Sequence, residues 1–127
     1  RFRAAVTMRS GVNRWSAMGT ADLGYDRVRQ FGVENWWEVD NLGPFLKQSP
    51  LVHASHINTP LLIEHQENDM RCPIDQAEQF YAALKYQRKP VKFVRYPGES
   101  HGMSRTGKPW HRVHRLRMIA EWFAEYL

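Results

Sequence analysis

Two polar segments carry side chains that could act as a general base and its orienting acid. Asp69 lies in residues 66–73, and His101 lies in residues 97–102; each segment follows a run typical of a buried strand. In open α/β sheets, sites lie beyond the carboxyl ends of the strands, and neighbouring strands are only about 4.8 Å apart. An Asp that holds a His in one tautomer forms two thirds of a hydrolytic triad. We therefore predict that Asp69 and His101 are catalytic.

The third member, a nucleophilic serine, is expected upstream of Asp69. In α/β-hydrolases the chain order is nucleophile, acid, histidine, and the serine sits in a G-x-S-x-G elbow between a strand and a helix. Between Arg1 and Asp69 no such elbow occurs. The segment Gly98–Gly102 matches the pattern literally, but we interpret residues 103–109 as a loop, and no Asp follows it. These features argue against Ser100 as the nucleophile.

The elements that must position these loops alternate between strand and helix. Runs rich in β-forming residues predict strands at residues 4–8, 59–65 and 91–96. Aromatic residues interrupted by glycines predict short helices and loops over residues 10–48, one helix covering 44–48. This alternation is typical of parallel strands with helical crossovers. We predict an α/β fold, a three-layer α/β/α unit with a mainly parallel sheet.

Two longer helices complete the pattern. Asp75 is a candidate N-cap with Glu78 at capping-box spacing, and Pro90 follows the end of that helix. Its expected apolar face consists of Ala77, Phe80, Tyr81 and Leu84. The last helix should begin at Pro109. Its expected apolar face consists of Val113, Leu116, Ala120, Phe123 and Leu127.

Composition excludes several classes of protein. The 127 residues are 43% hydrophobic and 24% charged, with a net charge of +5, which is ordinary for one globular domain. We expect no nucleic-acid partner, because the denser basic stretch between Arg105 and Arg117 contains no recognisable binding module and is typical of a solvated helix face. No apolar run approaches the roughly 20 residues of a membrane helix, so we expect no membrane association.

The cysteine and histidine content limits redox and metal chemistry. Cys72 is the single cysteine, which excludes an internal disulfide and is compatible with a cytoplasmic location. We interpret it as a small buried side chain. Two H-x-x-H pairs, His53/His56 and His111/His114, lack the carboxylate of an H-E-x-x-H site. We expect no metal ion and no other cofactor.

Several motifs in order resemble the C-terminal part of the catalytic domain of the prolyl oligopeptidase family, with acylaminoacyl-peptidase and dipeptidyl-peptidase-type members the most similar. They are Thr59–Ile63, Asn68–Ile74, Gln76–Gln79, Val94–Gly102, Ser104–Pro109, Ala4–Ser10 and Gly19–Gly24. The resemblance covers nearly the whole chain. It departs from the family pattern at residues 64–66, where a His-Gly pair is common, and at Met70, where an acidic residue is common.

The resemblance implies a serine peptidase with an N-terminal β-propeller and a C-terminal α/β-hydrolase domain. By motif, Asp69 corresponds to the triad acid and His101 to the triad base. The family serine lies before the segment that matches residues 4–9. We therefore expect residues 1–127 to be a partial hydrolase domain without the first strands, the nucleophile elbow and the propeller. The parent enzyme should hydrolyse peptides or N-acylated peptides, and this chain alone should be inactive.

Two alternatives remain at this point. The chain could be a non-catalytic α/β module that serves oligomerisation or binding, or a fragment of a lipase- or esterase-like hydrolase. A sheet without its first strands has an exposed edge, and exposed edges pair with other chains. We therefore expect a homo-oligomer that forms through the sheet edge or the helix faces.

Overall fold

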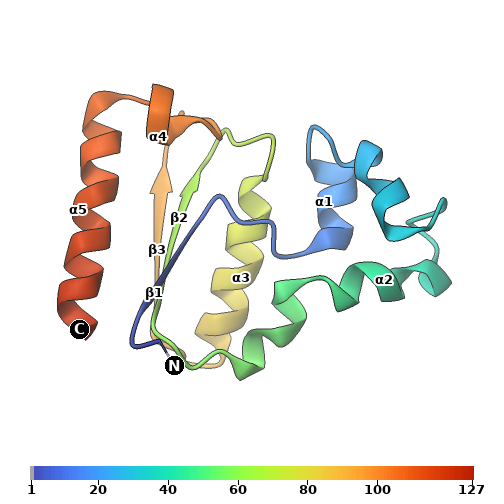
Figure 1. The fold of residues 1–127 in the computed structure, drawn as a ribbon, viewed down its shortest axis with the longest axis horizontal. Helices are drawn as coiled ribbons and strands as arrows, with labels where there is room; N and C mark the ends of the chain where they lie inside the picture. Colours follow the sequence, from blue (N-terminus) through green and yellow to red (C-terminus); the bar gives the residue numbers. More distant parts are fainter. Residues whose placement is uncertain (1) are drawn as a thin grey trace.

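Three parallel strands form the centre of the computed structural model, which describes residues 2–127 (Figure 1). The strands are β1 (Ala5–Met8), β2 (Leu61–Gln66) and β3 (Val91–Tyr96), in the order β1-β2-β3. Leu61 lies opposite Ala5 on one side and opposite Val91 on the other. The strand predictions are confirmed, and the central strand is buried at all six positions.

Helices cover both faces of this sheet, which confirms the predicted α/β class and its three layers (Figure 1). Helix α5 lies on one face, α3 lies on the other, and the segment containing α1 and α2 extends beyond α3. The helices are α1 (Arg14–Thr20), α2 (Leu42–Lys47), α3 (Ile74–Tyr86), α4 (Met103–Thr106) and α5 (Pro109–Tyr126), with 3₁₀ helices η1 (Tyr25–Phe31), η2 (Val39–Asn41) and η3 (Pro50–His56).

The main hydrophobic core lies between the sheet and α3. Leu61 and Ile63 of β2 pack with Phe80 and Leu84 of α3, and all four side chains are buried. The predicted apolar face of this helix is confirmed, because Ala77 is also buried in the cluster and Tyr81 packs against its margin. Apolar burial at this interface supplies the main force that fixes α3 beneath the sheet.

The predicted capping box at the start of α3 is wrong. The helix begins at Ile74 after Pro73, so Asp75 lies inside the first turn, and Pro73 provides no side-chain cap. The Asp75 carboxylate instead accepts hydrogen bonds from the amides of Gln76 and Gln79, at 3.1 and 2.9 Å. Glu78 forms an ion pair with Arg95 on β3. Asp75 therefore bonds to side chains of its own helix and Glu78 to a residue of β3, and neither carboxylate caps the helix.

The interpretation of residues 103–109 as a loop is also wrong in part, because Met103–Thr106 form the short helix α4. Gly107 ends it where the chain approaches itself closely. A Cβ at that position would lie 2.6 Å from the backbone oxygen of Met103. Only glycine fits there without a shift of the neighbouring atoms.

Helix α5 presents a different face to the sheet from the one predicted. Val113, Leu116 and Leu127 are exposed, whereas Trp122 is buried. Tyr96 explains this orientation, because the rings of His111 and His114 pack against its ring. The distances between the ring centroids are 5.6 and 5.8 Å. The sheet offers polar and aromatic groups on this side, so amphipathic side chains cover it better than aliphatic ones.

A buried carboxyl group lies among those polar groups. Glu64 of β2 is fully buried, and its Oε1 accepts a hydrogen bond of 2.9 Å from the hydroxyl of Tyr96. Burial raises the pKa of Glu64 to about 7, although this hydrogen bond and the positive charge of Arg115 oppose the rise. The carboxyl is therefore half protonated near neutral pH.

Gln76 joins the loop after β1 to α3. Its side chain is buried, and its Oε1 accepts hydrogen bonds from the backbone N–H groups of Val12 and Asn13, at 3.0 and 2.9 Å. Its Nε2 donates to the hydroxyl of Ser16 at 2.8 Å. One amide thus satisfies two backbone donors that would otherwise be unpaired at this position.

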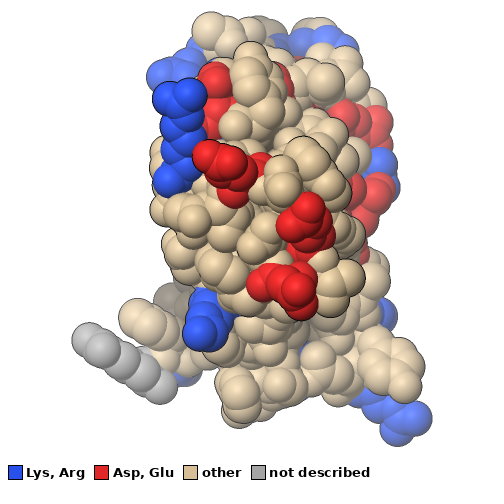
Figure 2. Space-filling view, turned by 90° about the vertical axis from the view of Figure 1, so that its right-hand side faces the viewer, with Lys and Arg blue, Asp and Glu red and all other residues tan. Residues whose placement is uncertain are grey.

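The charged surface shows no sign of a dedicated basic face on the side formed by the α1–α2 segment. Figure 2 shows this side as mostly uncharged, with acidic side chains toward its middle and basic side chains near its margins. None of the helices within residues 2–127 combines the length and the hydropathy that a membrane crossing requires.

Replacing Gln76 by Leu should lower the free energy of unfolding by about 2–6 kcal/mol, since two backbone N–H groups lose their acceptor and each costs about 1–3 kcal/mol. Urea unfolding followed by tryptophan fluorescence measures the change. Gln87→Leu is the matched control, because the Gln87 amide donates only to the carbonyl of Ala83 within the same helix. Equal losses in the two variants would contradict the role assigned to Gln76.

Replacing Glu64 by Gln should make stability less dependent on pH. The pKa of Glu64 is about 7 in the folded chain against an ordinary 4.5, so the folded state retains a proton that the unfolded state releases between these values. The contribution of Glu64 is fully present below the lower value and is lost as the pH rises through the higher one. The variant should gain about 3 kcal/mol relative to the native chain over this range. A constant difference in urea denaturation at each pH would refute the expectation.

Candidate active site

The structure brings Asp69 and His101 into direct contact. The Nδ1 atom of His101 lies 2.8 Å from Oδ2 and 3.1 Å from Oδ1 of Asp69. The carboxylate side chain is fully buried, whereas the imidazole is 36% exposed. A carboxylate at Nδ1 favours the tautomer with the proton on that nitrogen, which leaves Nε2 free to accept a proton. This pair can therefore act as an oriented general base.

Backbone hydrogen bonds hold the two loops together at the carboxyl edge of the sheet. The N–H of Asn68 donates to the carbonyl of Glu99 at 2.9 Å, and that of Glu67 donates to the carbonyl of Tyr96 at 3.1 Å. Gly98 turns the chain after β3 with a φ of +70°, in the left-handed region that favours glycine. The parallel register of β2 and β3 thus places the Asp69 loop beside the His101 loop.

The turn that follows Asp69 satisfies its carboxylate. Oδ1 accepts hydrogen bonds from the backbone N–H groups of Arg71 and Cys72, at 3.0 and 2.9 Å. A buried carboxylate is costly unless it is hydrogen-bonded, and this turn supplies donors on one oxygen while His101 faces the other. Asp69 thus both stabilises the turn after it and pairs with His101. Arg71 contributes its backbone to Asp69, not its guanidinium.

His65 is a second histidine near Asp69 that the sequence reasoning did not single out. Its Nε2 lies 2.7 Å from the carbonyl oxygen of Cys72 and 3.8 Å from Oδ2 of Asp69. Burial lowers the pKa of His65, so this ring is neutral and donates from Nε2 to the carbonyl. Its position near the end of the predicted strand, four residues before Asp69, could have indicated in the sequence that His65 lies close to Asp69.

A cavity of about 340 Å³ opens beside His101. Its lining includes Met70, Ser100, Gly102 and Arg105. An ion pair between Asp22 and Arg71, with Nε and Oδ1 at 2.8 Å, closes one side and joins the segment after α1 to the Asp69 loop. Arg9 donates to the backbone carbonyl of His101 at 3.0 Å. The exposed imidazole thus faces a space that can admit a substrate.

The other serine, cysteine and histidine side chains considered for catalysis or metal binding lack the partners that these roles require among residues 2–127. Ser100 is exposed, and within residues 2–127 no serine hydroxyl is hydrogen-bonded to the imidazole of His101. Burial raises the pKa of the Cys72 thiol, which disfavours the nucleophilic thiolate. His111 binds Glu99 at 2.7 Å. In the part of the chain that the structure describes, no three His, Cys, Asp or Glu side chains gather in a metal-binding cluster.

Known proteins are similar to this chain in sequence and in fold. The chain is 46% identical over 128 residues to a Bacillus subtilis protein named uncharacterized peptidase YuxL; the match covers 100% of this chain and 19% of the relative. A crystal structure of Pyrococcus horikoshii acylaminoacyl peptidase matches with a TM-score of 0.89 and 31% identity, over 99% of this chain and 20% of that one. An acylaminoacyl peptidase in complex with Z-Gly-Gly-Phe-chloromethyl ketone matches with a TM-score of 0.87 and 31% identity, over 97% and 20%.

The family model described as the prolyl oligopeptidase family matches residues 1–127. The chain spans about a fifth of the length of the relatives named above. This chain therefore belongs to the prolyl oligopeptidase family of peptidases.

Proposed function

We propose that the chain is the acid-and-base part of a serine peptidase catalytic domain, whose nucleophilic serine comes from polypeptide outside residues 1–127. The contact between His101 and the buried carboxylate of Asp69 carries this proposal. A hydrogen-bonded acid–base pair at the carboxyl ends of two parallel strands fits the required order of acid and histidine. Residues 1–127 are then one part of an α/β-hydrolase domain.

The proposed chemistry is acyl transfer through a covalent intermediate. The serine oxygen attacks the scissile carbonyl while Nε2 of His101 takes the hydroxyl proton. Asp69 keeps Nδ1–H in place and stabilises the imidazolium that forms. The proton then passes to the departing amine, the carbon–nitrogen bond breaks, and an acyl-serine remains. Water, deprotonated by the same Nε2, hydrolyses that ester and restores the serine.

Peptides or N-acylated peptides are the substrates that the comparisons favour. Two matched structures are acylaminoacyl peptidases, and one of them holds a peptide chloromethyl ketone. The Asp69–His101 pair supplies base chemistry but no side-chain preference. The non-catalytic alternative and the expected oligomer stay predictions, and no contact described above favours either of them.

A segment exchange tests the assignment of Asp69 and His101. The chain replaces the matching 128-residue segment of the Bacillus relative, which supplies the remainder of its own polypeptide. We expect the chimera to hydrolyse fluorogenic peptides or acyl-amino-acid amides. His101→Ala and Asp69→Asn should each lower kcat by about 10³–10⁴-fold, because one removes the base and the other its orienting acceptor. Steady-state kinetics at saturating substrate measures the losses.

Ser100→Ala in the same chimera should leave most of kcat, because no hydrogen bond joins the Ser100 hydroxyl to the imidazole of His101 within residues 2–127. Circular dichroism confirms that each variant folds. An active chimera that tolerates His101→Ala would rule out the assigned base. A large loss in Ser100→Ala would instead make that residue the nucleophile.

A fluorophosphonate probe tests where the nucleophile lies. Such probes phosphonylate activated serines, so residues 1–127 alone should gain no mass, and the chimera should gain one adduct on a serine outside the exchanged segment. Intact mass and peptide mapping measure both. An adduct on Ser100, or on any other serine of residues 1–127, would overturn the proposal that the nucleophile comes from elsewhere.

A further inference from the structure

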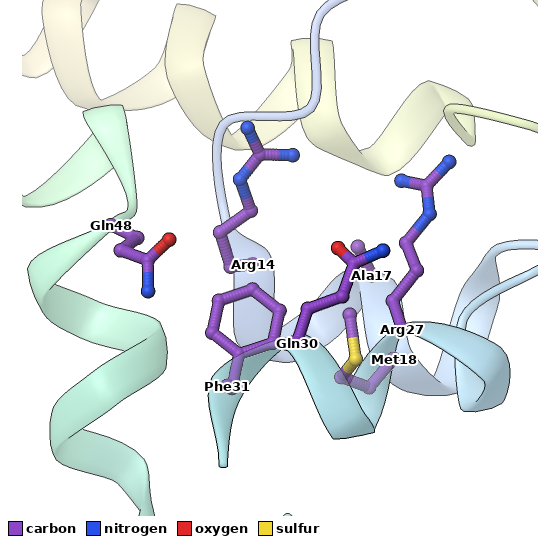
Figure 3. A pocket seen from close by; sticks show the side chains of 7 residues that line it. All are labelled: Arg14, Ala17, Met18, Arg27, Gln30, Phe31 and Gln48. Carbon is purple, nitrogen blue, oxygen red and sulfur yellow. The ribbon is translucent and has the colours of Figure 1, made fainter.

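A second cavity of about 340 Å³ lies among α1, η1 and the end of α2, and the chemistry above does not use it. Its lining side chains come from three elements (Figure 3). They are Arg14, Ala17, Met18, Arg27, Gln30, Phe31 and Gln48. The lining thus combines two cations and two amides with an apolar floor, and no acidic residue.

Helical spacing builds this arrangement. Arg14, Ala17 and Met18 stand at i, i+3 and i+4 on α1, so they share one face. On η1, Arg27 and Gln30 stand three residues apart, and such positions eclipse in a 3₁₀ helix. Figure 3 shows the guanidinium groups of Arg14 and Arg27 pointing to the same side of the cavity, toward α3, with the Gln30 amide between them.

Close packing fixes the two helices that carry the arginines. A Cβ on Gly24, just before η1, would lie 2.3 Å from the backbone oxygen of Met18, so only glycine allows η1 to approach α1 this closely. The ring of Phe31 packs against that of Phe45 of α2 in a tilted arrangement, with centroids 4.4 Å apart. The cavity is therefore formed by packed elements and is not a gap between loose loops.

Neither guanidinium forms a close ion pair with a carboxylate of residues 2–127. Within residues 2–127, the ion pairs of Arg side chains involve Arg71, Arg95 and Arg117, and none involves Arg14 or Arg27. Two half-buried cations that line one cavity repel one another, and an anion bound between them reduces that repulsion. A guanidinium binds a carboxylate through two parallel hydrogen bonds, and the amides of Gln30 and Gln48 can donate further ones.

The cavity adjoins the Asp69 loop. The segment that joins α1 to η1 contacts this loop directly, because the N–H of Asp22 donates to the carbonyl of Met70 at 2.7 Å. Arg27 lowers the pKa of Asp22, after the larger effect of the hydrogen bond from Arg71. Asp22 and Arg71 line the cavity that contains His101. A peptide held at His101 could therefore extend a carboxylate toward the two arginines.

We propose that the cavity between Arg14 and Arg27 binds a carboxylate of the peptide substrate. The inference rests on the proposed function for the identity of the ligand as a peptide. The carboxylate is either an acidic side chain or the C-terminal carboxyl group, because both offer the same planar pair of oxygens. The enzyme would then prefer acidic peptides over neutral ones of the same shape.

Methionine-methyl NMR of residues 1–127 tests the inference without any catalytic step. Met18 lines the cavity and Met8 lies on β1 outside it, so their methyl signals separate local from general effects. Three matched probes are titrated: N-acetyl-glutamate amide, N-acetyl-glutamine with a free carboxyl group, and N-acetyl-glutamine amide. We expect at least one acid to shift Met18 with a Kd about tenfold or more below that of the neutral amide. The two acids distinguish the side-chain source from the terminal one.

Arg14→Gln, Arg27→Gln and the double variant should each weaken acid binding, by about tenfold or more in the double variant. Arg29→Gln is the control, since Arg29 is an exposed residue of η1 that does not line this cavity. It should alter Kd by less than twofold. Equal affinity for the three probes, or unchanged acid binding in the double variant, would overturn the inference.

The chimera gives a second readout that also works if residues 1–127 do not fold alone. Peptides carrying Glu or Gln at each residue flanking the scissile bond, or at the C-terminus, are compared by kcat/KM. The double variant should reduce the preference for the acidic peptide about tenfold and leave neutral peptides unaffected. A chimera inactive on every peptide would contradict the proposed function, whereas an active chimera without any charge preference would contradict only this inference.

Discussion

The buried carboxylate of Asp69 is the constraint on which the organisation of this edge of the sheet depends. A carboxylate with no exposed surface requires hydrogen bonds from the protein in place of those that it loses from water. The N–H groups of Arg71 and Cys72 supply two of them, and the ring of His101 supplies the third. Each donor comes from a segment that the parallel strands β2 and β3 place at the same end.

The neighbouring contacts follow from that constraint. His65 donates a hydrogen bond to the carbonyl of Cys72. The turn that donates to Asp69 is therefore also bound to β2. Because burial lowers the pKa of His65, the ring remains neutral and does not compete with His101 as a cation beside Asp69. The ion pair of Asp22 and Arg71 then ties the turn to the segment after α1. His101, whose imidazole is partly exposed, lines the open cavity.

Different interactions hold the helices on the two faces of the sheet. Apolar packing of β2 against α3 fixes one face and explains why a simple helical pattern identified it correctly. On the other face Glu64 and Tyr96 form a buried polar pair, and α5 is oriented with His111 and His114 against Tyr96 and with Trp122 buried. The hydrophobic pattern of α5 predicts the wrong buried face, because such a pattern does not take into account the polar groups that the sheet buries on this side.

The sequence by itself determined the strand runs, the parallel α/β class, and Asp69 and His101 as the acid and base candidates. These depend on local periodicity and on residue types that follow the ends of strands. Only the tertiary structure decided that Glu78 pairs with Arg95, that His65 supports the Asp69 turn, and that Arg14 and Arg27 share a cavity. Contacts such as the one between Asp22 and Arg71 join residues 49 positions apart, and they depend on packing distances that no local pattern contains.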